Sequence, residues 1–549
     1  MSARARLLAL ALGLAALLLA QGPLLLHDPL LSRDDHTLLD PLTHVRSLAD
    51  YQAQRAAGRI LDLQPVRDLS FWLDLRAGEA LGHGVHHAMN LLVWLVCCAL
   101  VFLLLRGLLS DPRLVLALTL LFALHPLAVG SISWVAARKH LLACAFTLAA
   151  TLLLARTSRT GRWRDGLSAI ACYALGTLAQ PIALLWPLWA LACLWLAPLP
   201  GERSRRSMLV SLAAVPVTLA VGLANWRYYT TTYTAQGVKK LAEGSDAPLG
   251  ALLSLGRTTF NLLAPLRLAV VYDPRSPLGL AGLLLLPLAV WLLVRALGPR
   301  RALTWLGFAA FPLAVVTVRM TNIFVSDTYA LLPLAALAVL AGLVAESSPA
   351  RAGRALPIVS VLVAACAVGS VREARAWMSD AALWAHACET EGAALACAYH
   401  ASLLARTGHA AEAREVVLAA LERDPENPEV AAALGRVLLR DESLPVDERL
   451  RLLQAHPSSR AFPAYALGTL LARAGRFPEA SQALRRALEQ PRELGADLPV
   501  IAAEAVRLCE LAQQPDCSAP VERLRREPAF DQSRFDARLT ALRAPKPVP

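Results

Sequence analysis

Charged side chains are scarce in this sequence. Only 17% of its 549 residues are charged, 56% are hydrophobic, and the mean hydropathy is +0.47. A soluble domain carries about 25% charged residues, so the composition argues against an ordinary soluble protein and predicts membrane helices. Aromatic residues are also few, at 6%, and no basic helix stands out. The net charge of +12 therefore does not indicate nucleic-acid binding, because the Arg residues gather in short segments between apolar runs.

The cysteines show no Cys-x-x-Cys spacing of the kind that marks structural zinc sites. Six of the ten lie inside apolar runs, where a free cysteine is usually a small core residue. The other four lie beyond the last apolar run and form two close pairs, Cys388 with Cys397 and Cys509 with Cys517. These pairs suit disulfides only if that end of the chain faces an oxidising compartment.

Eleven apolar segments are candidates for membrane crossings. They cover residues 7–26, 88–105, 114–131, 141–155, 167–179, 181–197, 208–224, 279–295, 302–318, 329–345 and 355–371. The first could be a cleaved signal peptide, but it is longer than a typical signal core, so we favour an uncleaved helix. Every loop on the N-terminal side contains Arg, and the positive-inside rule therefore predicts a cytoplasmic N-terminus.

The opposite side receives three larger pieces: residues 27–87, residues 225–278, and everything after about residue 372. Within the second piece, Leu249 to Val271 is apolar but broken by Gly256, Pro265 and two arginines, which favours interfacial or re-entrant helices. An odd number of crossings places the C-terminal region outside the cytoplasm. That side is also the one on which the paired cysteines would form disulfides.

Residues 372–520 carry a repeat of about 34 residues that is typical of tetratricopeptide helix pairs. Residues 394–427 and 461–494 fit the pattern, with Gly408 and Gly475 in the turns, whereas residues 428–460 begin correctly and then degenerate. Stacked pairs would form an α-solenoid with a groove for a protein or peptide partner; a generic helical bundle is the alternative. Residues 521–549 are expected to be a partly disordered tail.

Asp34 and Asp35 stand at the start of the first outer loop. Two adjacent carboxylates at a membrane face can supply a general base, because one can remain ionised while a cation holds the other. The plainer interpretations are a solvated acidic turn, or Asp34 acting as a helix cap. Histidines are also frequent in residues 27–87, including His83, but they lack regular ligand spacing, so a divalent metal is not favoured.

Further motifs follow the acidic pair in a fixed order. They are Pro65-Val-Arg67-Asp-Leu-Ser70-Phe71-Trp-Leu-Asp74, His87-Ala-Met-Asn90, His125-Pro126 through Trp134 to Arg138-Lys139-His140, Gln180-Pro181, Val271-Tyr272-Asp273-Pro274 and Ser326-Asp327-Thr328-Tyr329. Along nearly the whole chain this order resembles the bacterial relatives of the transmembrane and tetratricopeptide-repeat O-mannosyltransferases, of the C-type glycosyltransferase superfamily. The resemblance implies an all-α fold: a glycosyltransferase-like membrane domain over residues 1–371, followed by the repeats.

The resemblance also implies an activity. The expected enzyme is an inverting glycosyltransferase of the bacterial inner membrane, moving a mannose-like sugar from a polyprenyl phosphate to a hydroxyl of a periplasmic protein. Asp34 and Asp35 would be catalytic, with no certain cofactor, and Arg138 and Lys139 would stabilise the leaving phosphate. The residues expected to bind substrate are His87, Asn90, His125, Arg138, Lys139, Asp327 and Tyr329. Alternatively, His125 simply ends a helix, and Arg138 and Lys139 anchor lipid headgroups.

Several positions depart from the family pattern. Ala128 stands in place of a His, Gly130 in place of a Glu and His140 in place of an Asp, while Leu63-Gln64 and Asp327-Thr328-Tyr329 also differ. Polar partners for a phosphate are thus missing. Two hypotheses follow: a divergent transferase, which we favour, or an inactive membrane-anchored scaffold that recruits partners through its repeats. A transporter is less consistent, because the bundle has no internal repeat and no buried charge relay.

Overall fold

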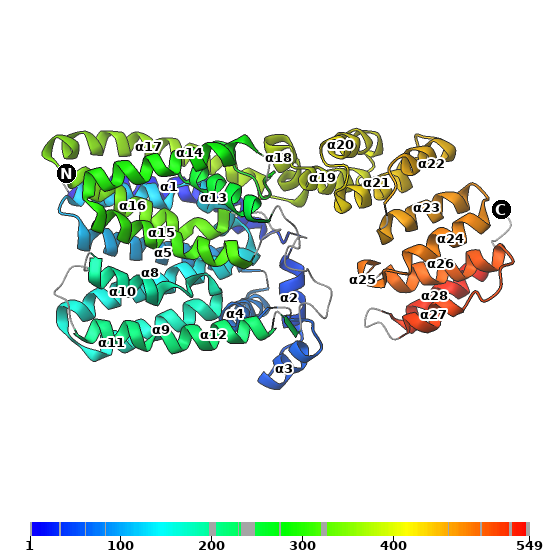
Figure 1. The fold of residues 1–549 in the computed structure, drawn as a ribbon, viewed down its shortest axis with the longest axis horizontal. Coiled ribbons are helices and arrows are strands. Elements are labelled where there is room, and N and C mark those ends of the chain that lie inside the picture. Colours follow the sequence, from blue (N-terminus) through cyan, green and yellow to red (C-terminus); the bar gives the residue numbers. More distant parts are fainter. Residues whose placement is uncertain are drawn as a thin grey trace. The chain divides into compact units, whose positions relative to one another are not determined.

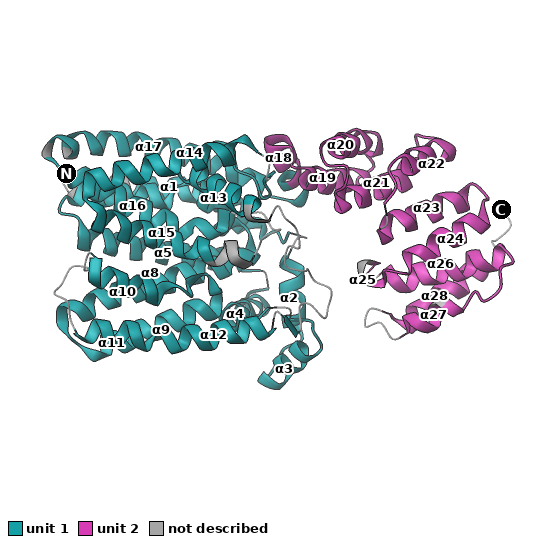
Figure 2. Cartoon of the chain, in the orientation of Figure 1, with its two compact units in different colours: residues 1–383 teal, residues 384–549 magenta. Residues whose placement is uncertain are grey.

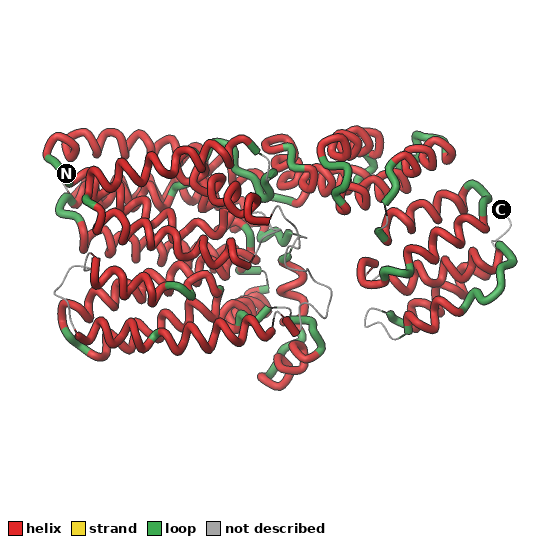
Figure 3. Tube along the Cα trace, viewed as in Figure 1, coloured by secondary structure: helices red, strands yellow, loops and turns green. Residues whose placement is uncertain are grey.

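The computed structural model describes residues 3–31, 34–60, 62–82, 84–196, 205–228, 230–231, 247–273, 276–319, 327–458, 460–494, 497–525 and 530–544. Within these ranges the regular elements are all helices (Figures 1 and 3), which confirms the expected all-helical fold. The chain divides into two compact units, Met1–Leu383 and Trp384–Pro549 (Figure 2). The boundary expected after residue 371 falls inside α17 (Pro349–Ala376), which belongs to the first unit.

The first unit is a bundle of apolar helices. Besides α17 they are α1 (Ala3–His27), α5 (His86–Leu108), α6 (Pro112–Ala123), α8 (Arg138–Thr160), α9 (Trp163–Ala179), α10 (Trp186–Leu196), α11 (Arg205–Ala213), α12 (Val215–Tyr228), α13 (Ala247–Leu263), α14 (Pro277–Leu297), α15 (Pro299–Arg319) and α16 (Leu331–Glu346). Their buried side chains form one core, in which Trp94 stacks on Phe122 and Tyr173 on Trp186.

Six helical segments among the described residues are long and apolar enough to cross a membrane. They are His86–Leu108, Val135–Thr160, Arg205–Tyr228, Pro277–Leu297, Asp327–Glu346 and Gly353–Ala376. A seventh arises if Pro112–Ala123 and Pro126–Ser133, which meet at 45°, form one bent span. The apolar parts of α1 and of Pro181–Leu196 are shorter, so among the described residues six or seven of the eleven expected crossings are long and apolar enough to span.

The bend has a local cause. Pro126 has no N–H to donate to the carbonyl oxygen of Phe122, so α6 ends at Ala123. Leu124 still donates to Leu120, whereas His125 donates at 3.5 Å to Phe122 and is extended. The chain continues as η1 (Pro126–Ala128), α7 (Val129–Ser133) and η2 (Val135–Ala137) before α8 begins. We call residues 124–137 the broken segment. Its side chains from Pro126 to Ala137 are buried, so its backbone must find partners inside the protein.

The chain between α1 and α5, described over residues 28–31, 34–60, 62–82 and 84–85, contains three helices. These are α2 (Asp35–Thr43), α3 (Leu48–Ala56), which starts with a capping box between Ser47 and Asp50, and α4 (Pro65–Leu81). Leu39 and Leu42 of α2 pack with Phe71 of α4 and with Val135 of the broken segment. This small apolar cluster holds the loop against the bundle at the point where the acidic pair lies.

Glycines permit one close helix crossing. An added Cβ on Gly256 of α13 would lie 2.0 Å from the carbonyl oxygen of Gly279, and one on Gly282 of α14 would lie 1.8 Å from that of Gly256. The sequence predicted interfacial or re-entrant helices over residues 249–271. The structure instead has a helix that ends at Leu263 and packs closely on α14, followed by irregular chain.

The second unit is a series of helices joined by short turns. They are α18 (Asp380–Glu391), which begins in the first unit, α19 (Ala394–Arg406), α20 (Ala410–Arg423), α21 (Pro428–Arg440), α22 (Val446–Ala455), α23 (Ala461–Arg473), α24 (Phe477–Ala487), α25 (Pro491–Leu494), α26 (Leu498–Leu511), α27 (Ala519–Leu524) and α28 (Gln532–Arg543). Gly408 and Gly475 take φ of 91° and 75° between paired helices. Small buried residues such as Ala401, Ala420 and Ala480 let those helices approach closely.

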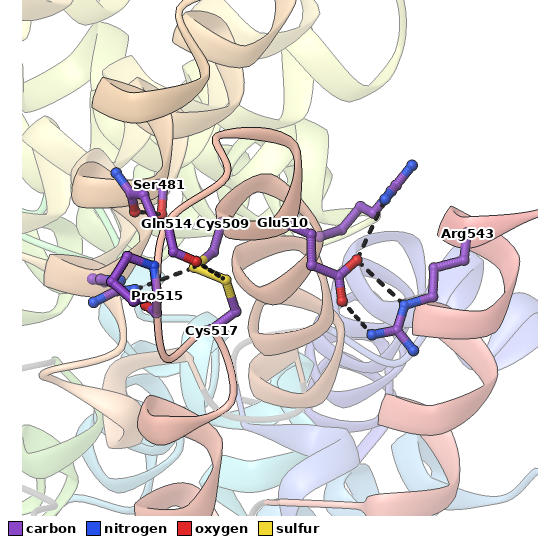
Figure 4. Close-up of a disulfide and its surroundings, with 9 residues drawn as sticks. Ser481, Cys509, Glu510, Gln514, Pro515, Cys517 and Arg543 are labelled. Atoms are coloured by element: carbon purple, nitrogen blue, oxygen red, sulfur yellow. Dashed lines mark hydrogen bonds and ion pairs between the residues drawn. A yellow bond between two sulfur atoms is a disulfide. The ribbon is translucent and has the colours of Figure 1, made fainter.

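Part of the tail that was expected to be partly disordered, residues 532–543, is helical. These residues form α28, whose Phe535 and Leu539 are buried against α26. Arg543 of α28 pairs with Glu510 of α26, beside the disulfide Cys509–Cys517 (Figure 4). The composition of the tail suggested disorder because its apolar residues are few, but those few lie on one face of a helix.

Both cysteine pairs of the second unit are disulfide-bonded. Cys388 and Cys397 join α18 to α19, and Cys509 and Cys517 close the turn after α26. The six remaining cysteines are free, and five of them are buried. The two groups of cysteines therefore differ in state as the sequence suggested.

Candidate active site

Asp35 lies at the first position of α2 and is only 1% exposed. Its Oδ2 accepts a hydrogen bond from the Leu31 N–H at 2.8 Å, and its Oδ1 accepts one from the Ala136 N–H at 2.8 Å. The first bond comes from the chain that follows α1 and the second from the broken segment. Asp35 thus connects the chain after α1 with the broken segment, and both regions carry motifs of the resemblance.

The acidic pair has an unusual protonation equilibrium. Burial raises the pKa of Asp35 to about 6, and the negative charge of Asp34 adds to the increase, while the two backbone donors oppose it. Asp34 is half-buried and precedes α2, but its side chain makes no capping hydrogen bond to that helix. The carboxyl of Asp35 can therefore take up or release a proton close to neutral pH.

His87 is fixed from both sides of its ring. Nδ1 lies 2.6 Å from Oδ1 of Asp28, and Nε2 lies 2.9 Å from the carbonyl oxygen of Ser133. Asp28 also accepts hydrogen bonds from the backbone N–H groups of His86 and His87 at the start of α5. Burial alone would raise the pKa of Asp28, but the hydrogen bonds and charge of His87 outweigh it and lower the pKa to about 2. His87 is thus a link between α1, α5 and the broken segment.

Asn90 satisfies two carbonyl groups of the broken segment. Its Nδ2 donates hydrogen bonds of 3.1 Å to the carbonyl oxygens of Ile132 and Trp134, and its Oδ1 accepts one of 2.7 Å from Nε of Arg138. The side chain is fully buried. Without it, the carbonyl oxygen of Ile132 would lose this donor in an apolar setting, which is costly, whereas that of Trp134 would keep the N–H of Ala137.

Arg138 is also fully buried and its charge is compensated. Its Nη2 lies 2.5 Å from Oδ2 of Asp74 and donates to the carbonyl oxygen of His86 at 2.8 Å. The guanidinium stacks 4.7 Å from the centre of the Phe71 ring. The same oxygen of Asp74 lies 3.0 Å from Nδ1 of His86. Arg138 therefore fastens α8 to α4 and α5.

Lys139 and His125 lie at the two ends of the broken segment. Lys139 is half-buried, one residue after Arg138. His125 is 5% exposed, and its Nδ1 accepts a hydrogen bond of 3.3 Å from the Leu127 N–H while the ring also bonds the backbone of Leu262. His125 thus caps η1 and ties the broken segment to α13.

Asp327 belongs to a second polar cluster. The Tyr272 hydroxyl donates to its Oδ2, and Asn261 Nδ2 donates to its Oδ1 at 2.9 Å. Arg257 donates to Asn261 Oδ1 at 3.0 Å and stacks 4.1 Å from the centre of the Tyr272 ring. Two motifs that are far apart in the sequence, those of Tyr272 and Asp327, meet in this cluster. Ser326, Pro274 and His83 lie outside the described residues.

Tyr329 lies next to one of the departures from the family pattern. Its ring meets that of His140 edge-on, with centroids 4.4 Å apart. His140 is 2% exposed, and its Nδ1 has no hydrogen-bond partner within the part of the chain that the structure describes. Where the resemblance expects an acidic Asp, the structure therefore has a buried aromatic contact.

The departure at Gly130 has a packing counterpart. A Cβ added to Gly130 would lie 2.8 Å from Cζ2 of Trp377, so the indole takes the room that a Glu would need. Trp377 is 4% exposed and stacks on Trp134 with centroids 6.3 Å apart. The resemblance expects a Glu at this position, and the sequence alone does not show that Trp377 fills the corresponding space.

The structure brings Asp35, His87, Asn90 and Arg138 together around the broken segment. Asp327 and Tyr329 come from the other side, through the contacts of η5 (Asp327–Ala330) with η1 and α7. Asp28 and Asp74 were not predicted as site residues. The positive φ of Asp28, 41°, leaves no trace in a sequence, but a carboxylate just after α1 and another within the Phe71 motif are natural partners for His87 and Arg138.

Within the described residues, no three His, Cys, Asp or Glu side chains are grouped so that they could hold a metal ion. No protein-family model matches the chain, and comparison with curated proteins and with solved structures likewise returns no match. The function is therefore argued from the geometry and the motifs.

Proposed function

We propose that the first unit is a membrane glycosyltransferase with Asp35 as its general base. The observation that carries this proposal is a buried carboxyl held by backbone donors from two separate segments, and burial raises its pKa to about 6. The donor is a mannose-like sugar on a polyprenyl phosphate, and the acceptor is a hydroxyl of a protein outside the cytoplasm. The motif resemblance to O-mannosyltransferases supplies this choice of substrates.

In the proposed reaction the acceptor oxygen attacks the anomeric carbon, and its proton passes to the carboxylate of Asp35. The new C–O bond forms as the bond from the anomeric carbon to the phosphate oxygen breaks, and the polyprenyl phosphate leaves with that electron pair. Configuration at the anomeric carbon is inverted. The negative charge of the neighbouring Asp34 raises the pKa of Asp35 and so makes Asp35 the stronger base.

Arg138 and Lys139 have different roles in this proposal. Arg138 faces Asp74 and Asn90, so it positions the broken segment instead of meeting the phosphate. Lys139, half-buried beside it, supplies positive charge near the leaving group. Asp327 and Tyr329 shape the wall of the site that lies toward α13.

The proposed setting is the bacterial inner membrane, with eleven crossings, a cytoplasmic N-terminus and the second unit in the periplasm as a tetratricopeptide-type solenoid. The disulfides Cys388–Cys397 and Cys509–Cys517 support an oxidising location. The successive helix pairs of α19 to α24 support the solenoid. Alkaline phosphatase fused after the second unit should be active and green fluorescent protein dark; the reverse pattern would overturn the orientation.

The activity is tested with purified protein, a polyprenyl-phosphate sugar and a peptide acceptor. Asp35→Asn should lower the rate of transfer by about 10²- to 10⁴-fold, the usual worth of a general base, and Asp34→Asn should lower it less, because Asp34 acts only through the basicity of Asp35. Asp40→Asn is the matched control, because Asp40 lies in the same helix but is exposed and pairs only with His36. Size-exclusion profiles and melting curves show whether each variant is folded. Unchanged transfer in a folded Asp35→Asn protein would remove the assignment.

A second candidate function is a membrane-anchored scaffold, and the second unit supports it. Arg406, Arg440 and Arg473 end α19, α21 and α23, spaced 34 and 33 residues apart, and all three side chains are exposed. Among the described residues none of the three pairs with an acidic group. Arg473 donates at 3.0 Å to the carbonyl oxygen of Leu439, beside Arg440, so neighbouring positions in the row lie close together.

Other exposed arginines of the same unit do pair with acids. They include Arg476 with Glu479 and Arg538 with Glu504. Arg406, Arg440 and Arg473, which have no acidic partner among the described residues, therefore suit an acidic segment of a partner protein. Full-length protein should bind a Glu-rich peptide in a salt-sensitive manner, and Arg440→Glu should weaken binding while Arg476→Glu should not. Such binding, together with no transfer from any polyprenyl sugar, would favour the scaffold.

A further inference from the structure

A groove lies between α5 and α6, on a part of the first unit that the proposed reaction does not use. Its volume is about 430 Å³, within the range of pockets that take small ligands. Six of its lining residues are Cys98, Ala99, Phe102, Arg106, Val115 and Thr119. All but Arg106 present mainly apolar surface, since the Thr119 hydroxyl is bonded within α6 to the carbonyl oxygen of Val115.

The lining follows helical spacing on both sides. Ala99, Phe102 and Arg106 are three and four residues apart on α5, and Val115 and Thr119 are four apart on α6, so the groove runs along the helices. From Cys98 to Arg106 the rise is about 12 Å at 1.5 Å per residue. This is close to the hydrocarbon depth of one leaflet, half of about 30 Å.

Two arginines without an acidic partner among the described residues lie at one end of the groove. Arg106 and Arg113 have exposed side chains, and neither pairs with an acidic group among the described residues. The nearest carboxylates are engaged elsewhere: Glu346 accepts from the backbone N–H groups of Ser110 and Asp111, and Asp111 accepts from that of Arg113. An apolar groove with Arg106 at one end suits a lipid with an anionic headgroup.

We infer that this groove binds one acyl chain of an anionic phospholipid, with the headgroup phosphate at Arg106. The inference rests on the membrane location proposed above but not on the transferase activity. The sugar donor is a poor alternative occupant, because Asn90 of the candidate site and Arg106 are sixteen residues apart on α5, about 24 Å. A phosphate at Arg106 therefore lies near the other end of the helix from Asp35.

The test is native mass spectrometry of delipidated full-length protein titrated with phosphatidylglycerol or phosphatidylcholine. Phosphatidylglycerol should bind more tightly, and Arg106→Gln should weaken its binding about fivefold, the effect of one Arg near an anionic headgroup. The matched control is Arg159→Gln, an exposed Arg at the end of α8 that does not line the groove. Ala99→Trp should block both lipids, because the indole would fill the groove from an exposed position.

Equal binding of the two lipids, or Arg106→Gln binding like wild type, would overturn the inference. So would displacement of phosphatidylglycerol from the wild type by polyprenyl phosphate. Asp35→Asn should leave phosphatidylglycerol binding unchanged. A protein that binds this lipid as predicted but transfers no sugar would therefore refute the transferase alone, and one that transfers sugar without lipid selectivity would refute the lipid site alone.

Discussion

Asp35 and Arg138 are both buried at the broken segment, but they are held in different ways. Asp35 receives its hydrogen bonds from two backbone N–H groups, and Arg138 and His87 act on it only through their charge. Arg138 faces a full counter-charge, Asp74, and a side-chain amide, Asn90. Burial therefore leaves Asp35 with a displaced protonation equilibrium, whereas it leaves Arg138 as part of the framework. In the proposed function, Asp35 is therefore the reactive group, and Arg138 holds the surrounding structure in place.

The largest effect should come from Arg138→Gln. Removing the guanidinium leaves Asp74 buried without a counter-charge, which costs about 3–5 kcal/mol of unfolding free energy. Denaturant titration in detergent would measure the loss, and Arg138→Gln with Asp74→Asn should recover part of it. A variant that kept full stability but lost only affinity for the sugar donor would make Arg138 a phosphate ligand and would erase the contrast with Asp35.

Gly130→Glu should come next. The new side chain meets Trp377, and overpacking of this kind costs about 1–3 kcal/mol. Trp377→Ala in the same chain should relieve the clash, so the double variant should be more stable than the sum of the two single changes predicts. Melting temperatures of the four proteins complete the cycle. If the two changes simply added, Trp377 would not occupy the space of the missing Glu.

The dependence of the transfer rate on pH tests the role proposed for Asp35. The base must be ionised, so the rate should fall as pH decreases through about 6, by about tenfold per pH unit below it. Stability should change in the opposite sense: the raised pKa means that the folded state binds the proton more readily, so Asp35 favours the fold below pH 4 and this contribution disappears as pH rises through 6. A rate profile flat from pH 5 to 7 would contradict the role of Asp35.

The smallest effect is expected at Asp40. Its side chain is exposed in α2 and makes a weak pair with His36 at 3.7 Å. Asp40→Asn should change the unfolding free energy by less than about 0.5 kcal/mol and leave the rate of transfer unaltered. A marked loss of transfer in this variant would show that general charge in α2, and not the placement of Asp35, controls the reaction.

The sequence predicted the helices from their apolar periodicity, but it did not predict contacts between residues that are far apart in the chain. The helices follow from apolar runs, so each of the eleven segments expected in the membrane is mainly helical, and among the described residues six or seven are long and apolar enough to cross a membrane. The contacts of Asp28 with His87 and of Gly130 with Trp377 join residues far apart in the chain, and no local pattern encodes them. The helix at residues 532–543 was missed because a short amphipathic segment in a polar tail resembles disorder.

Asn90 has a consequence for the order in which the chain assembles. It precedes the broken segment in the sequence, so it emerges first during synthesis, and its amide is already present on α5 when Ile132 and Trp134 follow. Hydrocarbon offers no solvent for an exposed carbonyl. The earlier helix α5 therefore presents the Asn90 donor before the turn at Ile132 to Trp134 forms. In an Asn90→Leu chain every helix should still form, but the chain should remain incompletely inserted and be degraded.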